Sequence, residues 1–209
     1  RRTQVDRHCP RIDRKTCQRA RRQSTCEKGL SYQRQLIKHC RACGSAVSYR
    51  LPDDGDTKLR AICTECHLVH YENPLNVVGT VPYFGQRVLL CKRNIEPRKG
   101  KWTLPAGFME LGESTSEGAA RETTEEAGAH FKMGSLFSVM SVPRVGQVHL
   151  YFLAELENEH FEPGFETQEA KMFSETEIPW DELAFRTVQE TLKHYFADKK
   201  SGSFGVHTL

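Results

Sequence analysis

Three carboxylates lie within one helical turn near the middle of the chain, in the run RETTEEAG at residues 121–128. On a helical projection, Glu122, Glu125 and Glu126 fall on a single arc of about 100°, so they are neighbours if the segment is helical. Like charges at this spacing cost roughly 0.2–0.5 kcal/mol per pair, and acids in a last helical turn oppose the helix dipole. The cluster is unfavourable on its own, so its chemistry depends on what neutralises it.

One basic residue is available in the same predicted helix. Arg121 follows Glu117 by four positions and precedes Glu125 by four, a spacing at which opposite charges pair on a helix surface. This pairing would leave Glu122 and Glu126 without a partner. A hard divalent cation, Mg²⁺ or Mn²⁺, binds oxygen ligands of this kind and would neutralise them. The alternative is a solvated acidic face, which is the usual meaning of a charge run.

The flanking residues favour the cation. Ser114-Thr-Ser-Glu117 fits a capping box and Gly128 fits the position just past a helix end, so the sequence predicts a helix over 115–127. An apolar run at 102–107 and a loop with glycine at 108–112 come immediately before it. Such a loop can bring backbone carbonyl oxygens close to a bound ion.

The chain also contains two pairs of cysteines with the two-residue gap of a metal knuckle, separated by 19 residues: Cys40 and Cys43, Cys63 and Cys66. Strand-like segments at 46–51 and 58–62, joined by a turn, bring the pairs together as a hairpin. Four thiolates close a tetrahedral shell, so the pattern predicts a zinc ribbon with a structural Zn²⁺. A pair of disulfides is the alternative, which would require an oxidising compartment.

The residues around the acidic helix resemble a known family. Gly107, then Glu113 after five residues, and then the run at 121–128 match the Nudix box of the Nudix hydrolases at every charged and glycine position. The departures are Thr123 and Ala129, where the family usually has bulky aliphatic residues, so they concern packing more than chemistry. The resemblance implies an α/β fold, a Nudix α/β/α sandwich with a mixed sheet, preceded by a small zinc ribbon.

The pattern of the remaining chain agrees with that fold. Strands are predicted at 77–84, 87–93, 135–142 and 147–156, and apolar residues on one side of 181–199 predict a closing helix. Strands with two dissimilar helices are typical of a mixed sheet between helical layers. No apolar run approaches the length of a membrane span, which predicts a soluble protein that does not engage a membrane.

The resemblance divides the chain into parts. Residues 39–72 are the expected zinc ribbon, 73–200 the Nudix hydrolase domain and 201–209 a C-terminal tail. Residues 1–38 lie outside the resemblance. The first 39 residues carry 12 of the 30 Lys and Arg but only 3 of the 27 Asp and Glu, without apolar periodicity, which predicts a disordered basic tail. Aromatic residues for base stacking are almost missing there, so nucleic acid is not an expected partner.

The order of ribbon and Nudix box looks like the FAD and ADP-ribose pyrophosphatases of plant chloroplasts and their bacterial relatives. It implies a metal-dependent enzyme that cleaves the diphosphate bridge of FAD and/or ADP-ribose to AMP plus FMN or ribose 5-phosphate. The expected partner is therefore a small nucleotide-diphosphate molecule. The resemblance also implies a chloroplast location, for which the transit-peptide signal is weak, with a cytoplasmic location as the alternative. It allows a homodimer.

The same resemblance assigns roles to individual residues. It makes Glu122 and Glu126 direct ligands of Mg²⁺ or Mn²⁺, together with the carbonyl of Ala106. Glu125 becomes a catalytic residue that either binds the ion directly or, oriented by Arg121, contacts the residues that bind it.

The remaining roles come from the loops. Glu113 is expected to brace the loop before the helix. The general base is expected from a later loop, and Glu169, immediately before a predicted strand at 171–173, is favoured over Glu166. The side chains expected to contact the phosphates or the base ring are cationic or aromatic: Arg93, Arg98, Lys99, Lys101, Phe161 and Phe165.

Two other functions fit parts of the pattern. One is an NADH pyrophosphatase or a hydrolase that removes NAD caps from RNA, because such enzymes also join a zinc ribbon to a Nudix domain. They carry an SQPWPFP-type array after the box, and residues 137–150 here have none. The other is an RNA-binding zinc-ribbon module with an inactive Nudix domain. The intact acidic cluster argues against it, because the acids would face RNA phosphates.

Overall fold

The structure is a computed structural model that describes residues 36–209. The basic tail predicted at 1–38 therefore lies outside the described residues, except for its last three positions. Among the helices of the described range, none is long and apolar enough to cross a membrane.

The first part of the described chain is a small antiparallel sheet. β1 (Val47–Arg50), β2 (Arg60–Cys63) and β3 (Val69–His70) pair in the order β1-β2-β3. The predicted hairpin is confirmed, and a third short strand follows the second cysteine pair. Few of its side chains are buried and apolar: Cys40, Ala61, Ile62 and Cys63. A core this small contributes little folding free energy of its own.

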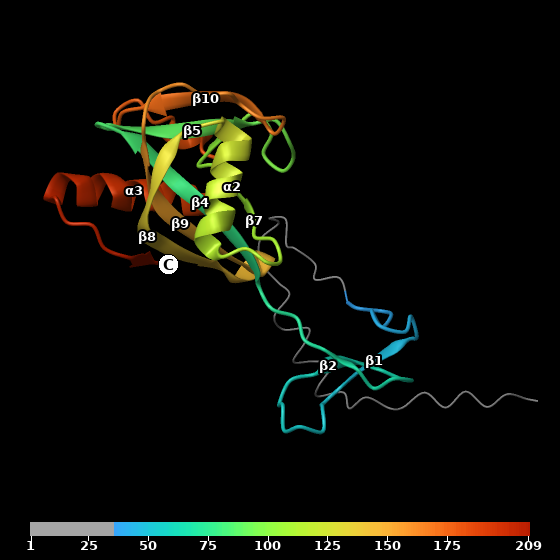
Figure 1. Cartoon of the computed structure of the whole chain (residues 1–209). Coiled ribbons are helices and arrows are strands. Elements are labelled where there is room, and N and C mark those ends of the chain that lie inside the picture. Colours follow the sequence, from blue (N-terminus) through green and yellow to red (C-terminus); the bar gives the residue numbers. More distant parts are fainter. Residues whose placement is uncertain (1–35) are drawn as a thin grey trace, which may run out of the picture. The chain divides into compact units, whose positions relative to one another are not determined.

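The second part is built on one mixed sheet (Figure 1). Its strands follow the order β10-β5-β4-β9-β8-β11, with β4 and β9 parallel. The bounds of these strands are β4 (Leu75–Phe84), β5 (Arg87–Arg93), β8 (Phe131–Val142), β9 (Gln147–Leu156), β10 (Thr167–Phe173) and β11 (His207–Thr208). Two short strands, β6 (Trp102–Thr103) and β7 (Ala106–Phe108), pair with β5 and β4. The strands predicted at 77–84, 87–93, 135–142, 147–156 and 171–173 are all present, and β8 and β10 begin earlier than predicted.

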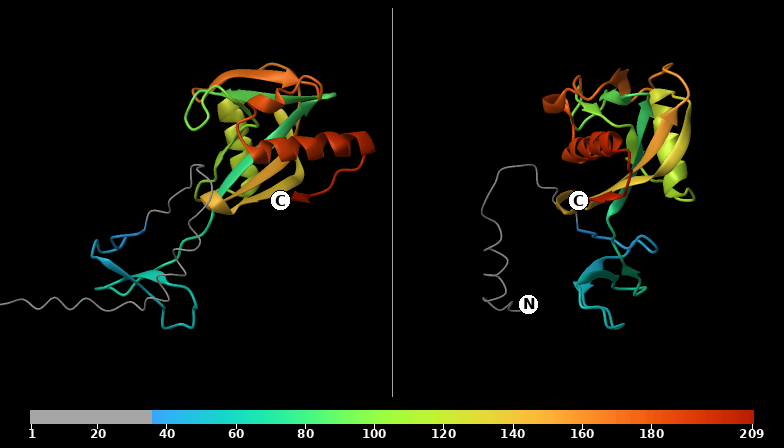
Figure 2. Two further views of the ribbon diagram at one scale, coloured as in Figure 1. Left: turned by 180° about the vertical axis from the view of Figure 1, so that it is seen from behind. Right: turned by 90° about the vertical axis from the view of Figure 1, so that its left-hand side faces the viewer.

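The two long helices cover opposite faces of this sheet (Figure 2). α2 (Thr115–Ala127) lies on one face and α3 (Arg186–Ser201) on the other. The buried side chains divide in the same way: a large cluster contains Val188 and Leu192 of α3, and two smaller clusters contain Ala119 or Ala127 of α2. The α/β/α arrangement with a mixed sheet is therefore as predicted.

α2 begins and ends where the sequence predicts. The hydroxyl of Ser114 accepts the N–H of Glu117, and the carboxylate of Glu117 accepts the N–H of Ser114, which closes the capping box. Gly128 has a φ of 59°, and its N–H donates to the carbonyl of Thr124 at 2.8 Å. The left-handed backbone at the helix end explains why glycine occupies this position.

The two departures from the family pattern, Thr123 and Ala129, are both buried. The Thr123 hydroxyl bonds the carbonyl of Ala119 at 2.8 Å and lies 2.7 Å from the hydroxyl of Thr80 on β4. A pair of hydroxyls thus takes the place of an aliphatic contact, with both polar groups satisfied. Ala129 is buried in the same cluster as Leu156. The helix packs on β4 at Thr123, and the segment just after the helix packs in the apolar cluster at Ala129.

The closing helix begins later than the sequence predicts. Trp180–Glu182 forms a single 3₁₀ turn, and α3 starts only at Arg186. Between them the chain is held extended, because Leu183 bridges to Trp102 of β6 and Ala184 donates its N–H to the carbonyl of the same residue at 2.8 Å. The predicted apolar face of the helix is buried: Val188, Leu192, Tyr195 and Phe196.

The end of the chain, predicted as a tail, joins the sheet instead. β11 pairs in parallel with β8, and the N–H of Leu209 donates to the carbonyl of Val139 at 3.2 Å. Asp198 of α3 supports this return, because its carboxylate lies 2.8 Å from Nε2 of His207. The partners of β11 are far away in sequence, so the local composition gave no sign of a strand.

A buried histidine lies between β9 and α3. His149 Nδ1 is 3.1 Å from the hydroxyl of Thr187, and its Nε2 is 3.0 Å from Oε1 of Gln147. Burial lowers the pKa of His149 to about 4. Because an unfolded histidine titrates at about 6.5, the folded state should lose at most about 3 kcal/mol of stability as pH falls from about 6.5 to about 4.

We expect His149→Gln to remove this part of the acid sensitivity. Denaturant unfolding above and below that pH window measures the change for wild type and variant. His130→Gln is the control, because His130 is exposed and should leave the pH dependence as it is in wild type. Equal acid sensitivity in the wild type and in His149→Gln would contradict the expectation.

Candidate active site

The acidic residues of α2 lie against the segment that precedes the helix. The Glu122 side chain is 13% exposed and packs on Gly107 of β7, where an added Cβ would overlap its carboxylate. Glycine is needed at this position because a side chain would displace the acid. Glu126 is buried, and its Oε2 accepts the N–H of Ala106 at 3.3 Å. β7 therefore holds both carboxylates in one place.

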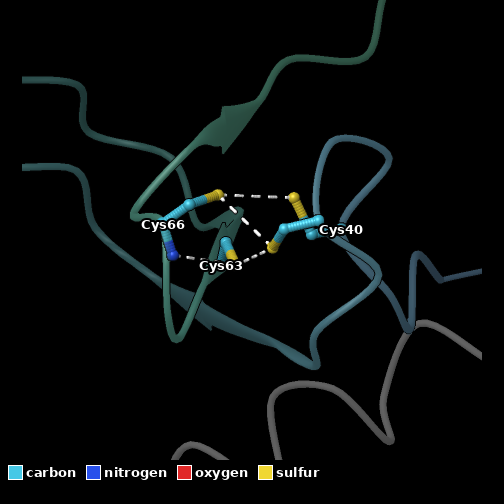
Figure 3. Close-up of side chains that lie close together, drawn as sticks. Cys40, Cys63 and Cys66 are labelled. Carbon is cyan, nitrogen blue, oxygen red and sulfur yellow. Dashed lines mark hydrogen bonds between the residues drawn. The ribbon is translucent and has the colours of Figure 1, made fainter.

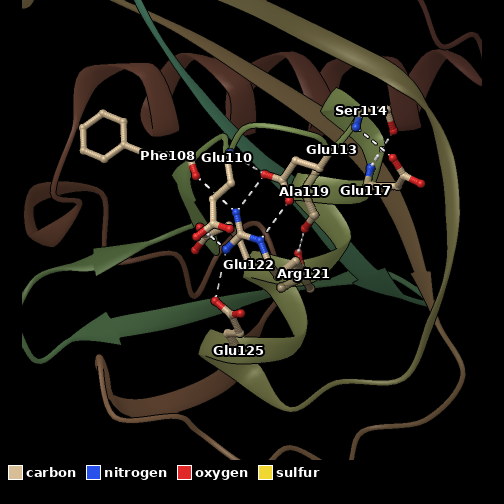
Figure 4. A network of polar contacts seen from close by, with 10 residues as sticks. Phe108, Glu110, Glu113, Ser114, Glu117, Ala119, Arg121, Glu122 and Glu125 are labelled. Carbon is tan, nitrogen blue, oxygen red and sulfur yellow. Dashed lines mark hydrogen bonds and ion pairs between the residues drawn. The ribbon is translucent and has the colours of Figure 1, made fainter. Parts of the chain in front are cut away.

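Arg121 and Glu113 together brace the loop before α2 (Figure 4). Arg121 donates from Nε and Nη2 to the two carboxylate oxygens of Glu113, at 3.0 and 2.9 Å, and from Nη2 to the carbonyl of Phe108 at 3.1 Å. Glu113 also accepts the N–H of Glu110 at 2.7 Å. The bonds from Arg121 and then this N–H lower the pKa of Glu113 to about 2. The geometry fits the bracing role expected for Glu113.

The other end of the Arg121 guanidinium points to the acidic cluster. Nη1 bonds Glu122 at 2.7 Å and Glu125 at 3.2 Å (Figure 4). The predicted pair with Glu125 is present. The predicted pair with Glu117 is absent because that carboxylate closes the capping box, and Glu122 is paired although it was expected to be free. Arg121 therefore orients two acids of the cluster.

The cluster has an excess of negative charge. The pKa of Glu126 is raised to about 8, chiefly by burial and then by the charge of Glu122 and Glu166, while a backbone N–H and the charge of Arg93 lower it. Burial also raises the pKa of Glu122, against the hydrogen bond from Arg121. Near neutral pH such a cluster keeps a proton unless a cation takes its place. These oxygen donors fit a hard divalent cation such as Mg²⁺ or Mn²⁺.

The strand register removes Glu169 from this cluster. Glu169 pairs with Lys92 across β10 and β5, and the next pair is Ala170 with Cys91, both of which lie in an apolar cluster on the α2 side. Alternate residues of a strand point to opposite faces, so Glu169 and Lys92 point to the α3 side. Lys92 accordingly lies 5.7 Å from the ring centre of Trp102, on that side. This corrects the preference for Glu169 as the general base.

Glu166, the other acid considered as the base, lies near the acidic cluster. It lies in the loop between β9 and β10, before a β-bulge in the pairing of β10 with β5. Its charge raises the pKa of both Glu122 and Glu126, so it is close to the acidic cluster. Sequence spacing alone could not distinguish the two acids, because the bulge sets which one faces the cluster.

Arg93 is also close to the acids. Its charge lowers the pKa of Glu126, and its guanidinium lies 5.3 Å from the ring centre of Phe185. Its Nε donates to the carbonyl of Pro97 at 2.9 Å. Phe185 lies in the range predicted as the closing helix, where the sequence gives no sign of this contact. Cation–π pairs of this kind join residues far apart in the chain, which no local pattern reveals.

The other residues predicted to contact the substrate do not gather in one cluster. Lys101 pairs with Glu182 at 2.8 Å. Phe161 is partly buried against the apolar cluster on the α2 side, whereas Phe165 is 87% exposed. Two cations are exposed in the loop after β5: Arg98 and Lys99. Arg98 has a φ of 68°, an uncommon backbone for a residue other than glycine.

The four predicted zinc ligands come together in the ribbon (Figure 3). Their sulfur atoms all lie within 4.8 Å of one another, with Cys40 and Cys66 at 3.6 Å and Cys43 and Cys63 at 3.4 Å. Zn–S bonds of about 2.3 Å in a tetrahedron require sulfur separations of roughly 3.8 Å. The set fits a structural Zn²⁺, and the sulfurs are too far apart for disulfides.

Comparisons with known proteins match both parts of the chain. The NUDIX domain family matches residues 74–196, and a Nudix N-terminal zinc-ribbon family matches residues 38–72. The crystal structure of a NUDIX hydrolase from Nitrosomonas europaea has 46% sequence identity and a TM-score of 0.78, and the match covers 83% of this chain and 99% of that chain.

Two relatives of named activity are similar in sequence. The ADP-ribose pyrophosphatase of Methanocaldococcus jannaschii is 33% identical over 119 residues, which cover 55% of this chain and 69% of that protein. The NAD-capped RNA hydrolase NudC of Vibrio parahaemolyticus is 24% identical over 169 residues, which cover 78% of this chain and 63% of that protein.

Proposed function

The chain belongs to the Nudix hydrolase family, and we propose that it is a metal-dependent pyrophosphatase that cleaves the diphosphate bridge of ADP-ribose and/or FAD. The observation that supports this most directly is the buried carboxylate of Glu126, held against β7 beside Glu122 and near Glu166. The similarity to an ADP-ribose pyrophosphatase supports ADP-ribose as a substrate. FAD rests on the resemblance of the ribbon and Nudix box to the plant enzymes.

The proposed ligands of Mg²⁺ or Mn²⁺ are Glu122, Glu126 and the carbonyl of Ala106. When bound, such an ion neutralises the non-bridging oxygens of a diphosphate and lowers the pKa of a bound water. Arg121 contributes by fixing the carboxylate of Glu122 through a 2.7 Å hydrogen bond. Pre-set ligands of this kind need no reorganisation when the substrate arrives.

We assign the proton transfer to Glu166. A water that attacks one phosphorus atom gives its proton to this carboxylate, and the bond from that phosphorus to the bridging oxygen breaks. The bridging oxygen leaves with the other phosphate, and the attacked phosphorus keeps the oxygen that came from the water. Arg93, held over the ring of Phe185, supplies positive charge beside the acids for the phosphates of the substrate. Phe165 is exposed and available to stack on the base ring.

The rival function is hydrolysis of NADH or of NAD-capped RNA. Its support is the NudC match, which covers more of this chain than the ADP-ribose pyrophosphatase match does. Its weakness is the missing SQPWPFP-type array. An RNA-binding module with an inactive Nudix domain remains a third candidate, which predicts tight RNA retention without turnover.

Product analysis separates these candidates. The purified chain is incubated with ADP-ribose, FAD, NADH and NAD-capped RNA, each with Mg²⁺ or Mn²⁺. We expect AMP with ribose 5-phosphate or with FMN. Selective cleavage of NADH or of capped RNA would favour the rival, and RNA retention without any metal-dependent turnover would favour the binding module.

Location, assembly and domain division also remain proposals. A chloroplast location follows from the resemblance to the plant enzymes, and import into isolated chloroplasts tests it. A homodimer is tested by light scattering of the purified chain.

The proposed domains are a zinc ribbon at 39–72 and a Nudix domain at 73–200, and limited proteolysis should cut between them.

A further inference from the structure

The loop between β9 and β10 is fastened to the end of α2. The N–H of Glu162 donates to the carbonyl of Ala127 at 2.9 Å, and the N–H of Gly164 donates to the carbonyl of Glu126 at 3.2 Å. Carbonyls of a last helical turn have no partner inside the helix, so these bonds satisfy them. A Cβ at Gly164 would overlap the carbonyl oxygen of Glu125. The loop therefore lies directly on the helix end that carries the acids.

The other side of the same loop is fastened by one residue, Asn94, which follows β5. Its N–H donates to the carbonyl of Glu166 at 2.8 Å, and its side-chain Nδ2 donates to the carbonyl of Phe165 at 3.0 Å. Its Oδ1 lies 3.5 Å from Nε2 of Gln168. Asn94 thus bonds the two carbonyls that flank the α-carbon of Glu166.

Beside these bonds, the loop is anchored where β10 begins, at the buried Thr167, which pairs with Arg93 of β5. Phe165 and Glu166 are both exposed, so no apolar side chain anchors them in the core. A segment held by a few exposed hydrogen bonds opens locally at low cost. The geometry of the acid in this loop therefore depends on Asn94 and the start of β10 on one side and on the helix end on the other.

We propose that Asn94 is a positioning residue for the reaction, because its side-chain amide fixes the backbone that carries Glu166 toward Glu122 and Glu126. This inference rests on the proposed function, in which Glu166 accepts the proton. A reacting group that is displaced by about 1 Å can cost about 100-fold in rate. A single amide far from the acids in sequence could therefore control turnover without touching the substrate.

The sharpest variant is Asn94→Asp. It keeps the size of the side chain but replaces the donor to the Phe165 carbonyl by an oxygen, so an attraction becomes a repulsion. Asn158→Asp is the matched control, because it adds the same charge to the connection between β9 and β10. Asn158 accepts the N–H of His160 at 2.9 Å through Oδ1, which an aspartate retains. We expect Asn94→Asp to lower kcat roughly 10- to 100-fold and the control to stay near wild type.

A double-mutant cycle with Glu166→Gln distinguishes positioning from a general structural effect. If Asn94 acts through Glu166, Asn94→Asp should cause no further loss of kcat in the Glu166→Gln background. An equal loss in both backgrounds would contradict the proposal. Repulsion of the anionic substrate by the new charge would also contradict it, and would show as a raised KM in both backgrounds.

Hydrogen exchange of the metal-free protein gives a second readout that does not depend on activity. The amide of Gly164 and that of Thr167, which donates to the Gly164 carbonyl at 3.0 Å, should exchange faster in Asn94→Asp and not in Asn158→Asp. The amides of α2 should keep their protection. Unchanged exchange at both loop amides would overturn the proposal. A wild-type chain that fails to cleave any diphosphate would instead remove the proposed function, while exchange still tests the role of Asn94 in holding the loop.

Discussion

Replacing Glu126 by glutamine should abolish diphosphate hydrolysis and leave the fold intact. The amide keeps the shape of the side chain and can still accept the N–H of Ala106, but it removes the charge that would bind a cation. Mutation of a residue that orients a metal ligand typically lowers activity about 10- to 100-fold. Loss of a direct ligand should therefore lower it by more than about 100-fold. Because burial already disfavours the charged form of Glu126, a neutral side chain should not destabilise the metal-free protein.

Steady-state rates with ADP-ribose and Mg²⁺, together with thermal melts in chelator, measure both parts of this expectation. Glu117→Gln is the matched control, because it lies in the same helix and glutamine also serves in a capping box. The control should retain wild-type activity. Full activity in Glu126→Gln would refute the role of that carboxylate, and an equal loss in the control would point to damage to the helix.

Removal of zinc should unfold the ribbon and leave the Nudix domain folded. Structural zinc contributes about 10–16 kcal/mol of apparent binding free energy in small zinc modules, and the ribbon has few buried apolar side chains to replace it. Cys43→Ser, or a strong chelator, should therefore abolish the protection of amides in the β1–β2 pair. Amides of β4 and β9 should stay protected.

The measurement is hydrogen exchange combined with a zinc assay, which should find one ion per chain in wild type and none in Cys43→Ser. Thr64→Ser is the control, because this residue lies inside the second cysteine pair and its hydroxyl bond to the carbonyl of Ala46 is kept by serine. A ribbon that remains protected without zinc would show that its own packing is sufficient.

The features that the sequence predicted correctly are local. The helix that carries Glu122 is bounded by a capping box and a glycine that act within one or two turns, and the strands follow from alternation over a few residues. The cysteine pairs likewise depend on a two-residue gap. Each of these patterns is complete within a short stretch, so contacts with the rest of the chain do not alter the local structure that it predicts.

The features that were missed depend on contacts between distant segments. The sequence favours Glu169 over Glu166 because Glu169 comes immediately before a predicted strand, and only the bulge and the register with β5 show which of the two faces the acids. Of the two partners predicted for Arg121 from helical spacing, Glu125 is bonded and Glu117 is not, and the carboxylate of Glu113 in the preceding loop accepts two further bonds. Local spacing describes the options available to a side chain, and tertiary packing selects among them.

The most direct test is anomalous diffraction from crystals grown with Mn²⁺ and a non-hydrolysable analogue of ADP-ribose. We predict a manganese peak between the carboxylates of Glu122 and Glu126, next to the diphosphate and within reach of Glu166. A diphosphate bound elsewhere, or carboxylates turned into solvent with no manganese between them, would contradict a role for these acids in binding the catalytic ion.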